Sequence, residues 1–557
     1  MKRKFHINKG LKVLLIVLGA LIILILGLGI YLNIHWNKTI RSELKSYVHD
    51  ISDGLYIAEF KEVRLNVFTG SLTVEKASMR LDTVVYEKML ALHIAPAETY
   101  QFTVEELRLK YFRPLRYFRG KELRAGSLTV IAPDLIIEHN ENIVDTSKPE
   151  TAYQHISSKM KFILIKTLQL DSTNLKYTFI RKDSSRIIHQ FRNLGIQVND
   201  FLIDSLALED PGRILYARNY VVKMKDYRFR SKDSLYWINI RNISYDAAAQ
   251  VFNIGQFELS PTLNKEDFQQ KLGFQQDYYN LSFEDISTEH LNIKKLLQEQ
   301  QIWADKMVIH GDIDIYRDRR PPMPSGNKLG KFPNQQLAKV PIPLFIDTLE
   351  GRRVNIQYTE TSPLTHQSGT LRFSNVNGNF RNITNIDSMV KSNDQLTADL
   401  DAIFMGSGKL KAHFDFTLGS KTGNFAVSGE LSNMNGRDLN PVTKPLGKVE
   451  IRSCDLKELT FHLKGDEMKA SGTLKLLYSN LRIAILEQDK DSKGYVRKGL
   501  ISLVANILAL HDSNPGQNGV VRTAKPVLQR DIHKSFFNLV WKTILEGVKE
   551  TVGTGKI

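Results

Sequence analysis

The sequence contains a single cysteine, Cys454, in 557 residues. One thiol can form neither an internal disulfide framework, nor a cysteine-based zinc site, nor a Cys-x-x-Cys redox pair. Familiar catalytic patterns are missing too, since no H-E-x-x-H, G-x-S-x-G or dinucleotide-binding glycine motif occurs. The Gly-Lys pairs in Gly406–Lys409 and Gly553–Lys556 lack the first glycine and the final hydroxyl residue of a phosphate loop. We therefore predict a protein that is not an enzyme, with no catalytic residues, no metal site and no cofactor.

Acidic residues are fewer than basic ones: the chain has 60 Asp and Glu residues and 76 Lys and Arg residues, which gives a formal net charge of +16. Such a balance suits anionic partners, whether nucleic acid, phospholipid headgroups or lipopolysaccharide. Hydrophobic residues make up 42% of the chain, so a folded protein is expected rather than a disordered one. The length exceeds that of one compact core, and it predicts several domains or one extended array.

The N-terminus combines a basic tail with a long uncharged segment. Residues 1–12 carry four lysines and one arginine, and Val13–Leu32 contains no charge over 20 residues. A helix of that length spans the hydrocarbon core of a bilayer, which predicts a transmembrane anchor. The alternative is a cleaved signal peptide, whose apolar region is usually shorter and ends in small residues. The positive-inside rule places residues 1–12 in the cytoplasm and the remainder outside, which removes nucleic acid from the expected partners.

From about Leu55 the hydrophobic pattern has a period of two. The segment GSLTV occurs twice, at Gly70–Val74 and Gly126–Val130, and apolar residues alternate around both copies. A similar hairpin-sized pattern recurs at Ile163–Phe179, Ile302–Asp318 and Leu344–Glu360. Many such strands at regular spacing predict a mainly β protein with an elongated, strongly curved antiparallel sheet that forms a trough.

Two kinds of segment interrupt the strands. Residues 317–343 contain six prolines, too many for a paired strand, and we expect the main domain boundary there. Helices are expected at Asn37–Ser52, Glu284–Gln301, Arg497–Asp512 and Gln529–Gly553. The predicted organisation is a cytoplasmic tail (1–12), an anchor (13–32), a β-rich region (33–316), a Pro-rich loop (317–343), a second β-rich region (344–490) and a helical C-terminal segment (491–557).

The last helix has a broad apolar side flanked by lysines. Two interpretations of this side are open: a cap over one end of the sheet, or a helix that docks on a membrane or a partner protein. The residues on this side are Phe536, Phe537, Val540, Trp541, Ile544 and Leu545.

This layout resembles the AsmA-like family of Gram-negative bacteria. The resemblance rests on the basic tail and anchor, on FTGSLTVEKASMRLD soon after them, and on SGTLKLLYSNLRIAILE near the C-terminus. It covers the two ends of the chain best, up to about His139 and from about Asp401 onward. It implies an inner-membrane protein with its bulk in the periplasm. It also implies a bridge-like β-groove, as in chorein-type proteins, and a role in moving phospholipid toward the outer membrane.

A lipid groove needs an apolar inside and a polar outside, which a period-two sheet supplies because successive side chains point to opposite faces. The alternative is that the same residues form a dry core under a second layer. The candidate lining residues are Val63, Leu65, Val67, Leu72, Val74, Leu128, Val130, Leu135 and Ile137.

We therefore expect an inner-membrane protein that binds or conducts phospholipid or another envelope lipid in outer-membrane lipid transport or homeostasis. The alternative function is a periplasmic scaffold or assembly factor for outer-membrane or secretion proteins. Partners expected under these readings are lipid, the inner membrane through the anchor, and envelope proteins through the C-terminal helix.

Overall fold

The structure is a computed structural model of the whole chain. It describes residues 49, 52–66, 69–113, 116, 120–143, 152–157, 160–207, 209–210, 212–214, 216–488, 495–497 and 510–554. The expected basic tail, the anchor at Val13–Leu32 and the helix at Asn37–Ser52 lie outside the described residues, apart from His49 and Ser52. Most of the expected helix at Arg497–Asp512 lies outside them as well. None of the helices in the described part of the chain is both long and apolar enough to cross a bilayer.

The described part of the chain is mainly β, with 57% of its residues in strands and 15% in helices, which confirms the predicted class. It divides into two compact units. Within the described residues, unit 1 comprises the chain up to Phe229 together with Asn239–Gly255 and Ile293–Glu299, and unit 2 comprises the rest. The division runs through strands β10 (Tyr236–Asp246) and β11 (Val251–Pro261).

Unit 1 is built on long strands with few helices. Its helices are α3 (Thr83–Ala91), α5 (Ala152–Ser157) and α7 (Ile293–Glu299). Its strands are β1 (Tyr56–Glu59), β2 (Glu62–Asn66), β3 (Ser71–Leu81), β4 (Glu98–Lys110), β5 (Glu122–Ile131), β6 (Asp134–Asn140), β7 (Phe162–Ile180), β8 (Arg186–Ile203) and β9 (Asn219–Arg230).

Unit 2 continues with strands of similar length. Its helices are α6 (Lys265–Leu272), α8 (Pro333–Leu337), α9 (Asp387–Ser392), η1 (Gly436–Leu439), α10 (Asn440–Gly447) and α12 (Phe536–Val552). Its strands are β12 (Asp277–Glu289), β13 (Ile302–Asp318), β14 (Leu344–Thr361), β15 (Ser368–Thr384), β16 (Gln395–Phe404), β17 (Gly408–Thr417), β18 (Phe425–Asn435), β19 (Val449–Gly465), β20 (Lys469–Gln488), β21 (Tyr495–Arg497), β22 (Thr523–Ala524) and β23 (Val527–Gln529).

The expectation of a purely antiparallel sheet is wrong, because the pairing is mixed. β5 and β6 both pair with β7 in parallel, and β13 pairs with β14 in parallel. Parallel neighbours need a crossover that carries the chain back to the starting end of the strand. The chain returns between β6 and β7, where the structure describes α5, and through residues 319–343 before β14. The Pro-rich loop is therefore a crossover inside unit 2, and the division between the units does not fall in it.

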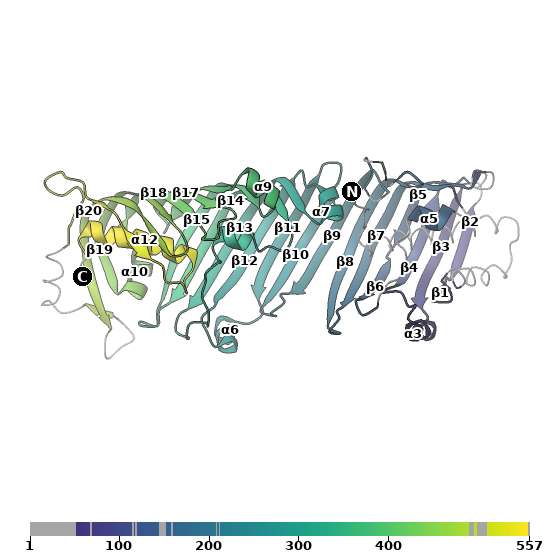
Figure 1. Cartoon of the computed structure of the whole chain (residues 1–557), viewed down its shortest axis with the longest axis horizontal. Coiled ribbons are helices and arrows are strands. Elements are labelled where there is room, and N and C mark those ends of the chain that lie inside the picture. The colour runs from purple at the N-terminus through teal and green to yellow at the C-terminus, as the bar shows by residue number, and fades with distance from the viewer. Residues whose placement is uncertain are drawn as a thin grey trace. The chain divides into compact units, whose positions relative to one another are not determined.

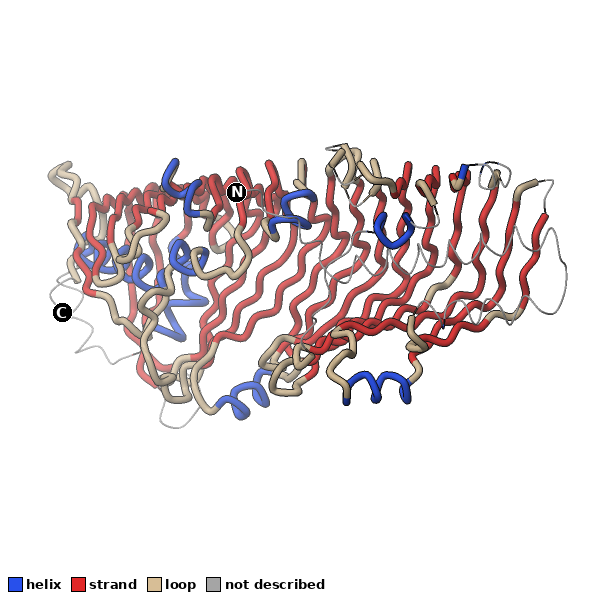
Figure 2. The backbone as a smooth tube through the Cα atoms, turned by 45° about the vertical axis from the view of Figure 1, so that its right-hand side comes forward, coloured by secondary structure: helices blue, strands red, loops and turns tan. Residues whose placement is uncertain are grey.

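Many strands bend at a residue with left-handed backbone torsion angles. In unit 1 these residues include Lys76 in β3, Ser172 in β7 and Asn193 in β8, with φ of 50–55°. In unit 2 the register of β12, β13, β14 and β15 shifts where Asp285, Gly311, Arg353 and Asn375 occur. One residue inserted into a strand bends it and increases its twist locally. Figure 2 shows the resulting long, bent strands.

The same insertion explains why the first part of the helix expected at Glu284–Gln301, Glu284–Glu289, belongs to a strand, whereas Ile293–Glu299 is helical. β12 runs to Glu289, and only α7 is helical. Asp285, with φ of 49°, interrupts the period of two, and the register against β13 shifts between Glu284 and Ser287. The interrupted alternation no longer matches the pattern of a strand, although the segment pairs as one.

The C-terminal helix α12 packs on the last strands of unit 2. Figure 1 shows it in yellow beside β19 and β20, and its buried Phe536 and Leu539 belong to the core cluster of those strands. The ring of Phe536 lies 4.8 Å from that of Phe425 and 5.2 Å from that of Phe332, between ring centroids. Phe332 is fully buried and comes from the Pro-rich loop, so helix and loop share one core.

We predict that Gly311→Ala destabilises unit 2. Gly311 has φ of 146°, and an added Cβ would lie 2.0 Å from the carbonyl oxygen of Ser282 on β12. A strained backbone position costs about 1–3 kcal/mol, so urea unfolding of the full chain should lose stability in that range. Gly447→Ala is the matched control, because its Cβ meets open space. Equal stability of the two variants would contradict the bulge as a constraint on the fold.

We also predict that Phe536→Ala lowers the free energy of unfolding by about 3–5 kcal/mol, as expected for removal of a buried aromatic ring. The neighbouring Phe537 is 64% exposed, so Phe537→Ala should change the free energy of unfolding by less than about 0.5 kcal/mol. Thermal unfolding followed by circular dichroism compares the two variants. If Phe536→Ala left the free energy of unfolding unchanged, α12 would not cap the sheet.

Candidate functional site

The two GSLTV copies lie on either side of β4. Leu72 of the first copy and Leu128 of the second both lie opposite Leu109. The alternation therefore builds continuous rows of apolar residues across the strands of unit 1. One row is Leu72, Leu109, Leu128, Leu168, Val198 and Tyr220, and the next is Val74, Leu107, Val130, Leu170, Ile196 and Val222.

Four of the predicted lining residues lie deep in this face. Leu72 is 2% exposed and Leu128 is fully buried, while Val74 and Val130 are each 4% exposed. All four belong to the core cluster of unit 1. Their burial matches the dry-core interpretation, in which a charge at any of them would cost several kcal/mol.

The other predicted lining residues lie toward the ends of the rows or beyond them. Ile137 is buried, and Leu135 is half-buried and packs against the same cluster. Val63 and Leu65 lie in β2 at the register positions opposite Val74 and Leu72. Val67 lies outside the described residues.

At one end of the strands of unit 1 the apolar rows give way to polar groups. Tyr100 donates a hydrogen bond of 2.5 Å to Glu98, and the other carboxylate oxygen of Glu98 lies 3.2 Å from Nδ1 of His139. Burial and the neighbouring Glu98 raise the pKa of Tyr100, and burial raises the pKa of Tyr56 to about 12. Both hydroxyls are neutral at physiological pH, and that of Tyr56 accepts a hydrogen bond from the backbone amide of Tyr100 at 3.3 Å.

Unit 2 carries apolar rows of the same kind, in which Phe404 is buried but most of the other side chains are only partly covered. One row is Leu281, Ile313, Ile356, Phe373 and Phe404, and the next is Tyr279, Ile315, Tyr358 and Leu371. Leu281, Ile313 and Ile356 are all half-buried. None of these residues is among the predicted lining residues, although the segments that contain Ile313 and Ile356 show the repeated hairpin pattern.

Beyond the tyrosines of unit 2 lies a row of charged residues from three strands. Asp277, Arg317 and Glu360 lie at neighbouring register positions on β12, β13 and β14. Arg317 bonds Asp277 at 3.0 Å, and Glu360 accepts from Arg319 at 2.8 Å and from Tyr358 at 2.9 Å. Burial, followed by the charge of Glu360, raises the pKa of Tyr358. From one end to the other, this face of unit 2 therefore changes from apolar through phenolic to ionic.

The predicted docking side of α12 is divided by the fold. Phe536 and Val540 are buried against the sheet, and Ile544 packs partly against the same core. Leu545 is half-buried, whereas Phe537 is 64% and Trp541 39% exposed. The cap interpretation holds for the buried part, and two aromatic side chains remain at the surface.

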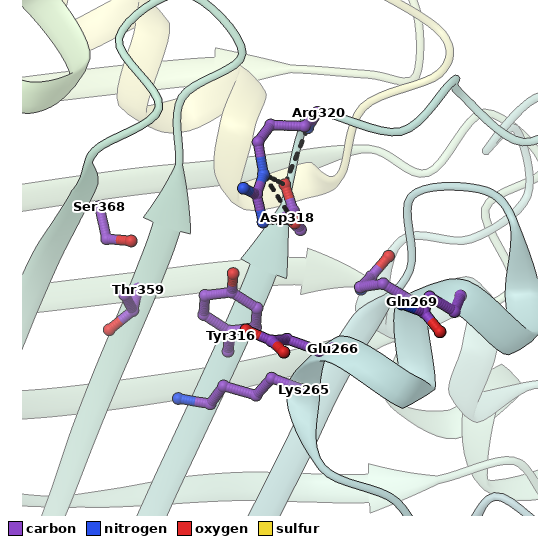
Figure 3. Close-up of a pocket in the computed structure, with 9 residues that line it drawn as sticks. Lys265, Glu266, Gln269, Tyr316, Asp318, Arg320, Thr359 and Ser368 are labelled. Atoms are coloured by element: carbon purple, nitrogen blue, oxygen red, sulfur yellow. Dashed lines mark hydrogen bonds and ion pairs between the residues drawn. The ribbon is translucent and has the colours of Figure 1, made fainter.

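A polar pocket of about 580 Å³ lies beside α6 in unit 2 (Figure 3). Its acid and base are already paired, since Asp318 accepts two hydrogen bonds from the Nε of Arg320 at 2.9 and 3.0 Å. Burial alone would raise the pKa of Asp318, but the hydrogen bonds from Arg320 outweigh it and lower the pKa. Lys265 lies 4.6 Å from the ring centroid of Tyr316. Because its charges neutralise each other, we assign this pocket no chemistry. The lining residues are Lys265, Glu266, Gln269, Gln270, Tyr316, Asp318, Arg320, Thr359 and Ser368.

Metal chemistry finds no support in the described parts of the chain, where no group of three His, Cys, Asp or Glu residues could hold an ion. The comparisons with known proteins give no further guidance, because no protein-family model and no curated protein matches the chain.

Proposed function

We propose that the protein binds the acyl chains of lipid along the apolar rows of its bent sheet and acts without catalysis. In the full proposal it is an AsmA-like protein anchored in the inner membrane. Its periplasmic strands would form an open trough that conducts phospholipid or another envelope lipid in outer-membrane lipid transport or homeostasis. The basic tail and the uncharged segment Val13–Leu32 support the anchor, and the resemblance at the two ends of the chain supports the family.

The observation that carries this proposal is the half-buried apolar face of unit 2. A dry core would cover Leu281, Ile313, Ile356 and Phe373, but each remains partly accessible to solvent. Covering apolar surface gains about 25 cal/mol per Å², so an acyl chain that lies on these rows gains from every side chain it covers. The gain does not depend on lipid species, which suits a carrier or conduit better than a selective receptor.

The change in character along the strands also favours an amphiphile. Tyrosine is preferred where one end of a site is apolar and the other polar, which is the position of Tyr279 and Tyr358. A lipid that lies along the strands would place its tail on the apolar rows and its headgroup at the row of Asp277, Arg317 and Glu360. Unit 1 has a similar change, from its apolar rows to Tyr100 and then Glu98.

A second candidate function is a periplasmic scaffold or assembly factor. Exposure of Phe537 and Trp541 on α12 favours it, because exposed aromatic side chains are enriched at protein–protein contacts. Under this alternative, α12 would contact an outer-membrane or other envelope protein.

Photo-crosslinking distinguishes the two functions. We predict that a photoreactive amino acid in place of Ile313 or Ile356 forms lipid adducts in cells of a Gram-negative host, detected by mass spectrometry of the full chain. The same group in place of Asn355 or Arg372, whose side chains are exposed on these strands, should form none, because successive side chains point to opposite faces. Protein adducts without lipid adducts at Ile313 and Ile356 would favour the scaffold.

A further inference from the structure

The ionic end of the apolar face in unit 2 is covered by two chain segments that are far apart in the sequence. One is the Pro-rich loop, and the other precedes α12. The amide of Lys328 donates to the carbonyl of Ile532 at 2.7 Å, and His533 Nδ1 lies 2.8 Å from the carbonyl oxygen of Gly326. Arg530 links the two segments, since its guanidinium donates hydrogen bonds to the carbonyl oxygens of Lys328 at 3.0 Å and Lys534 at 2.9 Å. The backbone around both lysines is therefore fixed.

The ammonium groups of Lys328 and Lys534 have no anionic partner at contact distance. Within the described residues neither group lies within 4.0 Å of a carboxylate, and Lys534 Nζ contacts only the sulfur of Met323, at 3.5 Å. A thioether is a weak acceptor, so it does little to offset the cost of a half-buried charge. Burial lowers the pKa of both lysines.

Positive charge is in excess around these two groups. Lys328 is attracted by Asp277 and repelled by Arg317, Lys331 and Arg530. Lys534 is repelled by Arg319 and Arg317 and attracted by Asp531 and Glu360. The nearest carboxylates, Asp277 and Glu360, are already bonded to Arg317 and Arg319, and Asp531 is exposed. The Nε atom of Arg319 is buried and has no hydrogen-bond partner. The cluster thus has donors and charge that the protein leaves unmatched.

We propose that Lys328, Lys534 and Arg319 form a binding site for a phosphate group at the ionic end of the apolar rows in unit 2. Lysine provides point charges and arginine a planar fork of donors, a combination that suits phosphate oxygens. An anion placed there would offset the surrounding positive charge and favour the charged form of the lysines. If the proposed function holds, the phosphate is the headgroup of a phospholipid whose tail lies on the apolar rows. Ile313 and Arg317 are four residues apart on β13, or about 13 Å, so headgroup and tail would occupy distinct parts of one strand.

The test compares two lipids with identical acyl chains, phosphatidylglycerol and diacylglycerol, of which only the first carries a headgroup with a phosphate. Full-length protein in detergent should bind phosphatidylglycerol about tenfold or more tightly, as expected for two charge-assisted contacts. Lys328→Met with Lys534→Met should remove that preference while diacylglycerol binding is unchanged. Lys525→Met with Lys542→Met is the matched control, because both of these lysines are exposed and the same charge is removed. This control should keep the preference.

The outcomes separate the phosphate site from the proposed function. Equal binding of both lipids by the natural chain would overturn the phosphate site and leave lipid binding standing, and this comparison needs no variant to fold. Binding of neither lipid would overturn the proposed function. In that case inorganic phosphate, measured by calorimetry, decides the site: binding that depends on Lys328 and Lys534 supports a site for free phosphate, and absence of binding contradicts it.

Discussion

The structure depends on bends within its strands. A strand with an unbroken period of two is nearly straight, and it can place only one of its faces on a core. Insertion of one residue with left-handed torsion angles, such as Ser172 in β7 or Gly311 in β13, bends the strand and restarts the alternation beyond the bend. Neighbouring strands carry such insertions at matching positions, so the sheet in each unit bends as a whole while its hydrogen bonds continue on both sides.

The bends also determine how the apolar residues are distributed. On β13, Ile313 and Ile315 follow Gly311, and on β14, Ile356 and Tyr358 follow Arg353, so the restarted alternation keeps the apolar rows in register. On β12 and β14 the order along the strand is apolar, phenolic, ionic, and on β13 between them Ile313 and Ile315 precede Arg317, so the change from apolar to ionic extends across these three strands. This polarity is what the proposed binding of an amphiphile rests on. The proposed phosphate site, at the ionic end of the apolar rows in unit 2, would add selectivity for the headgroup.

Sequence reasoning predicted the local structure better than the pairing. The alternation around Leu72 and Leu128 correctly predicted β3 and β5, and helical periodicity correctly predicted α12. The parallel pairing of β13 with β14 was not predictable, because a strand has the same local pattern whichever direction its neighbour runs. The end of β12 was not predicted for a related reason. The inserted residue Asp285 interrupts the period of two, although the strand continues beyond it.

The candidate site was less predictable than the fold. Leu72 and Leu128 drew attention because their segments are identical, yet both lie buried in the core cluster of unit 1. The charged row combines Asp277, Arg317 and Glu360 from three strands about 40 residues apart, and no local pattern connects them. Lys328 and Lys534 are more than 200 residues apart and come together only because the Pro-rich crossover and the segment before α12 cover the same end of the sheet.

Native mass spectrometry of the full-length protein tests the central claim most directly, namely that the half-buried rows of unit 2 hold lipid tails. The account predicts a bound species with the mass of a phospholipid on the natural chain. It also predicts loss of that species in the variant with Ile313→Asp and Ile356→Asp, which places charges on the row where solvent can reach them. A natural chain without bound lipid, or a variant that folds and retains the same lipid, would contradict the account.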